Sequence, residues 1–128
     1  MNKIVAVLLT LVLILTLVLT GFAAGLPELE GTWLGKTEVP DQGLDEVTMV
    51  IVKAKEGFSG TLVDSLGLIA KETAIKEIKL QANELTYHFS LVDEQEVWIK
   101  LTVDGDKLTG AWTTAEGDTG AIVFERKK

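Results

Sequence analysis

The stretch VWIKLTVDGDKLTGAW, residues 97–112, decides the fold. Alternate residues of its first half form an apolar row, which consists of Val97, Ile99, Leu101 and Val103. Since successive side chains of a β-strand point to opposite faces, this row predicts a strand with one apolar face. Asp104-Gly105-Asp106 then reverses the chain, because glycine readily adopts the positive φ that a tight turn needs. The stretch therefore predicts an antiparallel β-hairpin.

The first 25 residues have the order of an export signal. Lys3 is followed by an apolar run over residues 4–19, and small residues then occupy positions 21 and 23–25. This order is typical of a secretory signal peptide. The run also approaches the roughly 20 residues that span a bilayer, so an uncleaved membrane anchor through residues 4–24 is the alternative. We expect an exported protein, periplasmic or extracellular, with one mature domain over residues 26–128.

The composition of residues 26–128 argues against two classes of binding partner. This part carries 11 basic and 19 acidic side chains, a net charge of −8. Such an acidic chain argues against nucleic acid and against anionic membrane surfaces. The sequence contains no cysteine, so its stability depends on a packed core and not on disulfides.

Strand patterns recur along the rest of the chain at the spacing of an all-β sandwich or barrel. Besides the two arms of the hairpin, the predicted strands are residues 31–39, 47–55, 58–64, 75–81, 85–92 and 119–126. These eight antiparallel strands, joined mostly by short turns, favour closure into a single up-and-down β-barrel, because closure removes exposed sheet edges. Residues 66–73 are open to two interpretations, a short helix or a loop. A helix continuing to Leu80 competes with the strand at 75–81.

The two ends of the mature chain resemble the calycins, the lipocalin-like barrels. Gly31-Thr32-Trp33 resembles their G-x-W signature, and Arg126 stands late in the last strand, where the family has a basic residue stacked on that tryptophan. The resemblance implies barrel closure by Trp33 and Arg126 through a cation–π contact.

A second resemblance covers most of the mature chain. The motifs that carry it are Gly60–Ser65, Asn83–Thr86, Val103–Trp112 and a last strand that ends at Arg126. They are similar to a small bacterial β-domain that follows a signal peptide or accompanies secreted hydrolases. That domain has no settled activity, so the resemblance implies export and a fold. The sequence departs from it at residues 66–73, where the family tends to have a loop with proline and glycine.

Motifs for catalysis, cofactors and metals are not found in the sequence. His88 is the only histidine and alternates with Thr86 and Ser90 on the predicted outer face, so it is interpreted as a surface residue. The acidic turns at 93–96 and 104–106 lack the ligand spacing of a calcium loop. We therefore expect no enzyme activity, no cofactor and no metal site.

The predicted barrel leaves two function classes. In the first, a small apolar or amphipathic ligand binds in an interior lined by Trp33, Tyr87, Phe89, Leu101 and Trp112, with the Tyr87 hydroxyl as its polar group. In the second, the core is filled and the domain binds a protein partner, as an inhibitor-like or accessory module. Its contact surface would then include Trp98, on the outer face, or the loop at 66–73.

Overall fold

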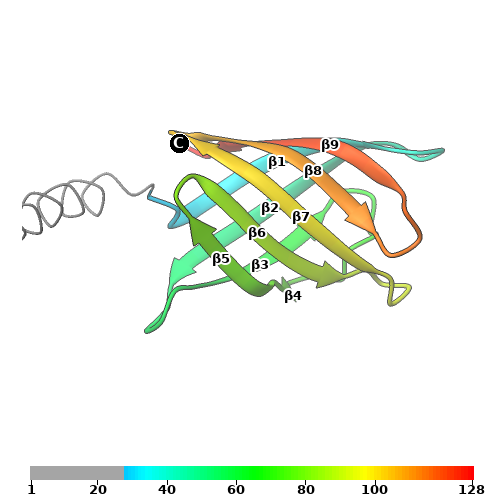
Figure 1. The fold of residues 1–128 in the computed structure, drawn as a ribbon. Coiled ribbons are helices and arrows are strands. Elements are labelled where there is room, and N and C mark those ends of the chain that lie inside the picture. Colours follow the sequence, from blue (N-terminus) through cyan, green and yellow to red (C-terminus); the bar gives the residue numbers. More distant parts are fainter. Residues whose placement is uncertain (1–27) are drawn as a thin grey trace, which may run out of the picture.

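The computed structural model describes residues 28–128, and the predicted signal segment lies outside them. Nine antiparallel strands form one sheet that curls into a small barrel (Figure 1). The strands are β1 Gly31–Val39, β2 Gly43–Lys53, β3 Phe58–Asp64, β4 Thr73–Ala74, β5 Lys76–Gln81, β6 Glu84–Ser90, β7 Glu96–Asp104, β8 Lys107–Thr114 and β9 Thr119–Arg126. No helix in this part of the chain is long and apolar enough to cross a membrane.

The strands follow one another around the barrel in the order β4-β3-β2-β1-β9-β8-β7-β6-β5. Every neighbouring pair is antiparallel, and β1 meets β9, so the two ends of the described chain lie side by side in the sheet. This is the predicted up-and-down topology with one difference. The strand expected at 75–81 is extended at its start and divided into β4 and β5.

The interruption between β4 and β5 closes the sheet. Residues of β4 pair with β3, whereas β5 pairs with β6. Ile75, between them, donates its backbone N–H to the Gly60 carbonyl of β3 over 2.9 Å. The β5–β6 register then shifts between Lys76 and Lys79. A shift of this kind bends a strand, and here the bend lets one segment span the gap between both edges of the sheet.

The segment before β4 is a loop, so the helix considered at 66–73 is wrong, as is the helix considered through Leu80. Gly67 and Glu72 have φ values of 77° and 58°, which a right-handed helix does not accept. The backbone of this loop is held by a side chain of β3. Asp64 accepts from the N–H of Leu68 over 3.1 Å and from that of Ile69 over 2.9 Å.

The hairpin predicted at 97–112 is confirmed. Asp104 of β7 pairs with Lys107 of β8, and Gly105, the first residue of the two-residue turn, has a φ of 60°. Glycine at this position is typical of a turn that matches the twist of the strands.

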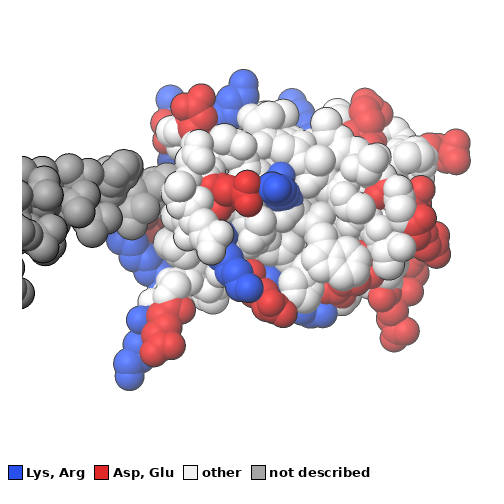
Figure 2. Space-filling view, viewed as in Figure 1, with Lys and Arg blue, Asp and Glu red and all other residues white. Residues whose placement is uncertain are grey.

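The apolar rows of the strands point inward and form one core. Its fully buried large side chains are Leu29, Trp33, Met49, Ile51, Leu62, Leu85, Leu101, Leu108 and Phe124. The surface is divided unevenly. Acidic side chains gather over the end that carries the β1–β2, β6–β7 and β8–β9 turns, on the right in Figures 1 and 2.

Candidate functional site

One end of the barrel is closed by packing around Trp33. The guanidinium carbon of Arg126 lies 4.2 Å from the centre of the Trp33 ring, and the two residues are paired across β1 and β9. Trp33 donates its Nε1–H to the Leu29 carbonyl over 3.0 Å, and Leu29 is itself fully buried. Arg126 Nη1 donates to the Glu30 carbonyl over 2.8 Å. The residues before β1 are thus held across this end.

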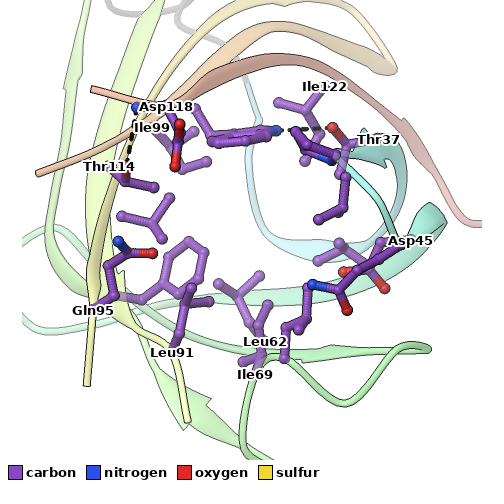
Figure 3. Close-up of a pocket in the computed structure, with 18 of the residues that line it drawn as sticks. Thr37, Asp45, Leu62, Ile69, Leu91, Gln95, Ile99, Thr114, Asp118 and Ile122 are labelled. Atoms are coloured by element: carbon purple, nitrogen blue, oxygen red, sulfur yellow. Dashed lines mark hydrogen bonds between the residues drawn. The ribbon is translucent and has the colours of Figure 1, made fainter. Parts of the chain in front are cut away.

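A cavity of about 410 Å³ occupies the other end. Four connecting segments surround it, residues 40–42, 65–72, 91–95 and 115–118. Figure 3 shows side chains from different strands pointing toward an open centre, with Ile99 and Thr114 on one wall and Thr37 and Asp45 on the opposite one. Pockets for small ligands typically measure about 300–1,000 Å³. The cavity therefore has room for one small molecule.

The cavity wall changes from apolar in the depth to polar at the rim. The apolar wall includes Val47, Leu62, Tyr87, Phe89, Ile99, Trp112, Ile122 and Phe124. The polar residues of the rim and upper wall are Thr37, Asp41, Gln42, Asp45, Asp93, Gln95, Thr114 and Asp118. An apolar wall with a few convergent polar groups is the usual composition of a ligand pocket.

Three of the five predicted interior residues border this cavity, and two do not. Tyr87, Phe89 and Trp112 belong to its wall. Trp33 and Leu101 also point into the barrel, but they lie in the filled part, where they are 0% and 1% exposed. The structure thus does not bring all five residues together around the cavity. Alternation identifies the face of a strand, but it does not say how far along the barrel the packing is complete.

The Trp112 ring is fixed in position by polar and steric contacts. Its Nε1–H donates to Thr37 Oγ1 over 2.8 Å, and Thr37 Oγ1 in turn donates to the Ala121 carbonyl over 2.6 Å. Gly120 gives the ring its space, since a Cβ on that residue would lie 2.5 Å from a ring carbon. A rigid aromatic surface therefore faces the cavity.

The Tyr87 hydroxyl is a buried polar group that has no hydrogen-bond partner among residues 28–128. Tyr87 is 3% exposed, and burial raises the pKa of its phenol well above the usual range. Leaving such a group unpaired costs folding free energy, because its hydrogen bonds to water are lost on burial. A ligand that formed a hydrogen bond with the Tyr87 hydroxyl would remove this unfavourable contribution.

Asp45 is a buried carboxyl that was not among the predicted site residues. It accepts from the Leu66 N–H over 3.0 Å and from the Ser65 hydroxyl over 3.3 Å, and Asp64 lies beside it. Burial, followed by the neighbouring Asp64, raises the pKa of Asp45 to about 6. The predicted strand began at Val47, whereas β2 begins at Gly43, and within it Asp45 has the same inward phase as Val47 and Met49.

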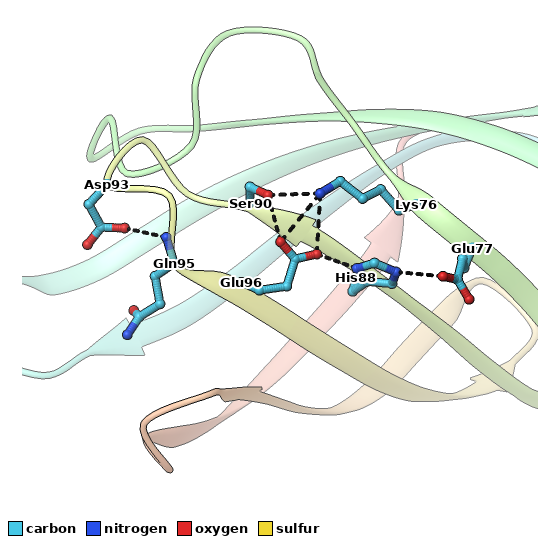
Figure 4. A network of polar contacts seen from close by, with 7 residues as sticks. All are labelled: Lys76, Glu77, His88, Ser90, Asp93, Gln95 and Glu96. Atoms are coloured by element: carbon cyan, nitrogen blue, oxygen red, sulfur yellow. Dashed lines mark hydrogen bonds and ion pairs between the residues drawn. The ribbon is translucent and has the colours of Figure 1, made fainter.

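The outer face of the barrel carries a second polar group of residues. His88 bridges Glu96, through Nδ1, and Glu77, through Nε2 at 3.3 Å (Figure 4). Lys76 reaches the Glu96 carboxylate at 3.4 Å, and the Ser90 hydroxyl donates to it over 2.6 Å. The hydrogen bonds from Ser90 and His88 lower the pKa of Glu96 to about 2, and the bond to Glu96 raises the pKa of His88.

Trp98 lies next to this network and is 46% exposed. Its ring stacks on His88 with centroids 6.3 Å apart and an interplanar angle of 24°. The structure thus places Trp98 on the outer face, as expected, where it covers His88. Across residues 28–128, no three His, Asp or Glu side chains converge in a metal-binding arrangement.

Comparison with known proteins relates the chain to small β-barrels by fold. A redesigned β-barrel superimposes with a TM-score of 0.63 at 15% identity, covering 78% of this chain and 92% of that protein. A de novo designed fluorescence-activating β-barrel gives a TM-score of 0.51 at 16% identity, covering 77% and 94%. No protein-family model matches the chain, and the comparison with curated proteins gives no match. The chain is accordingly a small antiparallel β-barrel.

Proposed function

We propose that the chain is an exported, non-enzymatic, lipocalin-like protein of the calycin type that holds a small apolar or amphipathic ligand in the open end of its barrel. The observation that carries this proposal is the cavity of about 410 Å³ with the unpaired Tyr87 hydroxyl in its wall. An interior of this kind can hold one small ligand in a barrel of about eight strands. The G-x-W pattern and the Trp33–Arg126 contact support the calycin type.

Binding of a neutral reporter tests this proposal directly. N-phenyl-1-naphthylamine becomes fluorescent in apolar surroundings and carries no charge that would bias the result. We expect saturable one-to-one binding and a higher melting temperature. Ligand at about 100 times Kd adds roughly 2.7 kcal/mol to the free energy of unfolding.

Two variants tell cavity binding from surface adsorption. Ile99→Phe replaces an aliphatic side chain of the cavity wall by a larger, aromatic one and should abolish reporter binding. Trp98→Ala removes the exposed outer tryptophan and should leave binding unchanged. If the reporter binds Ile99→Phe as well as the wild type, the cavity is not its site.

The second candidate is a protein-interaction module that works through Trp98. It is favoured by the 46% exposure of this large side chain on the outer face. Exposed aromatic residues are frequent anchors of protein interfaces. Trp98→Ala should then leave the stability nearly unchanged and abolish capture of the partner.

Export rests on the N-terminal sequence, which lies outside the described residues. Under this proposal the signal peptide is cleaved and the mature N-terminus lies between Ala24 and Leu26. N-terminal sequencing of the secreted protein is the test, and a chain that still begins at Met1 would favour the membrane anchor.

A further inference from the structure

The cavity's upper wall and rim have a single sign of charge. Asp41, Asp45, Asp93 and Asp118 border the cavity, and within residues 28–128 no lysine, arginine or histidine does. The four segments around it carry six acidic residues and one lysine, Lys71. These acids belong to the acidic end visible in Figure 2.

Asp45 brings this negative charge into the barrel wall. It is 3% exposed and, with Asp64, forms a carboxyl pair between β2 and β3. The β1 residue paired with Asp45 is Thr37, which is uncharged, and the loop contributes only Ser65 and Leu66. In the described part of the chain, neither carboxyl forms an ion pair with a basic side chain. A nearly buried anion without a counter-charge is unfavourable, and a cation beside it would be stabilised.

Tyr87 provides a second, independent observation. The Tyr87 hydroxyl is buried in the cavity wall without a partner in the described chain. The same wall includes Phe89, Ile99 and Trp112, which contribute apolar surface. The wall therefore matches a molecule with an apolar body, and the rim matches a positively charged end.

We infer that the ligand is an amphipathic cation, with its apolar body on the wall around Trp112 and its charged end among the rim aspartates. This inference rests on the proposed function and names the class of its ligand. It excludes anionic amphiphiles such as fatty acids, because their carboxylates would face like charges in a site with a low dielectric.

Three probes with one chain length and different head groups test the inference. Decyltrimethylammonium, decanol and decanoate are titrated at low ionic strength, below their micelle-forming concentrations, and each Kd is measured by displacement of N-phenyl-1-naphthylamine. We expect the affinity to fall in the order decyltrimethylammonium, decanol, decanoate. The Kd of the cation should be at least about tenfold lower than that of decanoate. Added salt should reduce the difference in Kd between the cation and decanoate, because it screens the charge of the rim aspartates.

Matched variants separate the rim from the overall charge of the protein. Asp45→Asn/Asp118→Asn should reduce the preference for the cation severalfold. Glu56→Gln/Asp104→Asn removes the same charge at the closed end and should leave the preference intact. The preference should also weaken below pH 6, because Asp45 then becomes protonated.

The outcomes distinguish the class of the ligand from the presence of a binding site. Decanoate binding as tightly as the cation would overturn the inference while leaving a ligand-binding barrel. An equal loss of preference in both double variants would also overturn it, since the effect would then belong to the net charge. Failure of all three probes and of the reporter to bind would contradict the proposed function and the inference together.

Discussion

At the closed end of the barrel Arg126 and Leu29 cover Trp33, whereas at the open end Trp112 faces a cavity of about 410 Å³. Both tryptophans stand at inward positions of regular strands. The difference comes from what lies beyond the strands. The residues before β1 fold back over Trp33, while the loop 65–72 runs along the rim and leaves the centre free. The closed end is thus filled by side chains, whereas the open end leaves room for a small molecule.

Replacing Trp33 should give the largest loss of stability. Trp33→Ala removes a fully buried ring from the closed end and should lower the free energy of unfolding by about 3–5 kcal/mol in urea denaturation. Arg126→Ala should cost less, about 1 kcal/mol plus the packing of its stem. A double-mutant cycle checks the contact, and strictly additive effects would contradict it.

Two neighbouring inward positions of β7 should respond differently to the same enlargement. Leu101 lies in the filled part and Ile99 at the cavity. Leu101→Phe should destabilise by about 1–3 kcal/mol because it overpacks the core. Ile99→Phe should cost less than about 1 kcal/mol, because its ring can extend into the cavity. Similar losses in thermal unfolding would mean that the open end is packed as tightly as the closed one.

The stability of the open end should depend on pH through Asp45. Its pKa is raised to about 6 in the folded state, so folding favours the protonated form. Protonated Asp45 therefore stabilises the folded state. This contribution to the free energy of unfolding is fully present below pH 4 and is lost as the pH rises through 6. Asp45→Asn should therefore stabilise the protein by about 1–2 kcal/mol at pH 8 and by much less at pH 4.

The exposed rim residue Asp118 provides the control for this measurement. Asp118→Asn removes the same charge from an exposed position. The role given to the Asp45–Asp64 pair would be contradicted if Asp45→Asn raised the free energy of unfolding by the same amount at pH 4 and pH 8.

Removing the Tyr87 hydroxyl should have the smallest effect on stability. Tyr87→Phe deletes an unpaired buried polar atom, so the change should be neutral or stabilising by less than about 1 kcal/mol. The same variant should weaken binding of a ligand only if that ligand pairs with the phenol. A clear loss of stability would show that this hydroxyl already has a partner.

The strands and the hairpin could be predicted because alternation and turn chemistry are local properties of the sequence. Gly105 and the apolar row from Val97 to Val103 determine the β7–β8 hairpin without reference to the rest of the chain. The loop at 66–73 could not be predicted in this way. Its composition suits a helix, and the side chain that fixes its backbone, Asp64, precedes it in β3.

The candidate site was only partly predictable for a related reason. Alternation placed Tyr87, Phe89 and Trp112 inside the barrel, and all three border the cavity. The same rule placed Trp33 and Leu101 with them, although packing from Leu29 and Arg126 fills that end. Asp45 was missed because the predicted strand began at Val47. Only the earlier start of β2, at Gly43, gives Asp45 an inward position.

Native mass spectrometry of the protein purified from its own host tests the central claim most directly. We predict a second species heavier than the protein by the mass of one small molecule, present in the wild type and in Trp98→Ala and absent in Ile99→Phe. Spectra that show only the mass of the protein in the wild type, or an adduct that persists unchanged in Ile99→Phe, would contradict the claim that the open end holds a ligand.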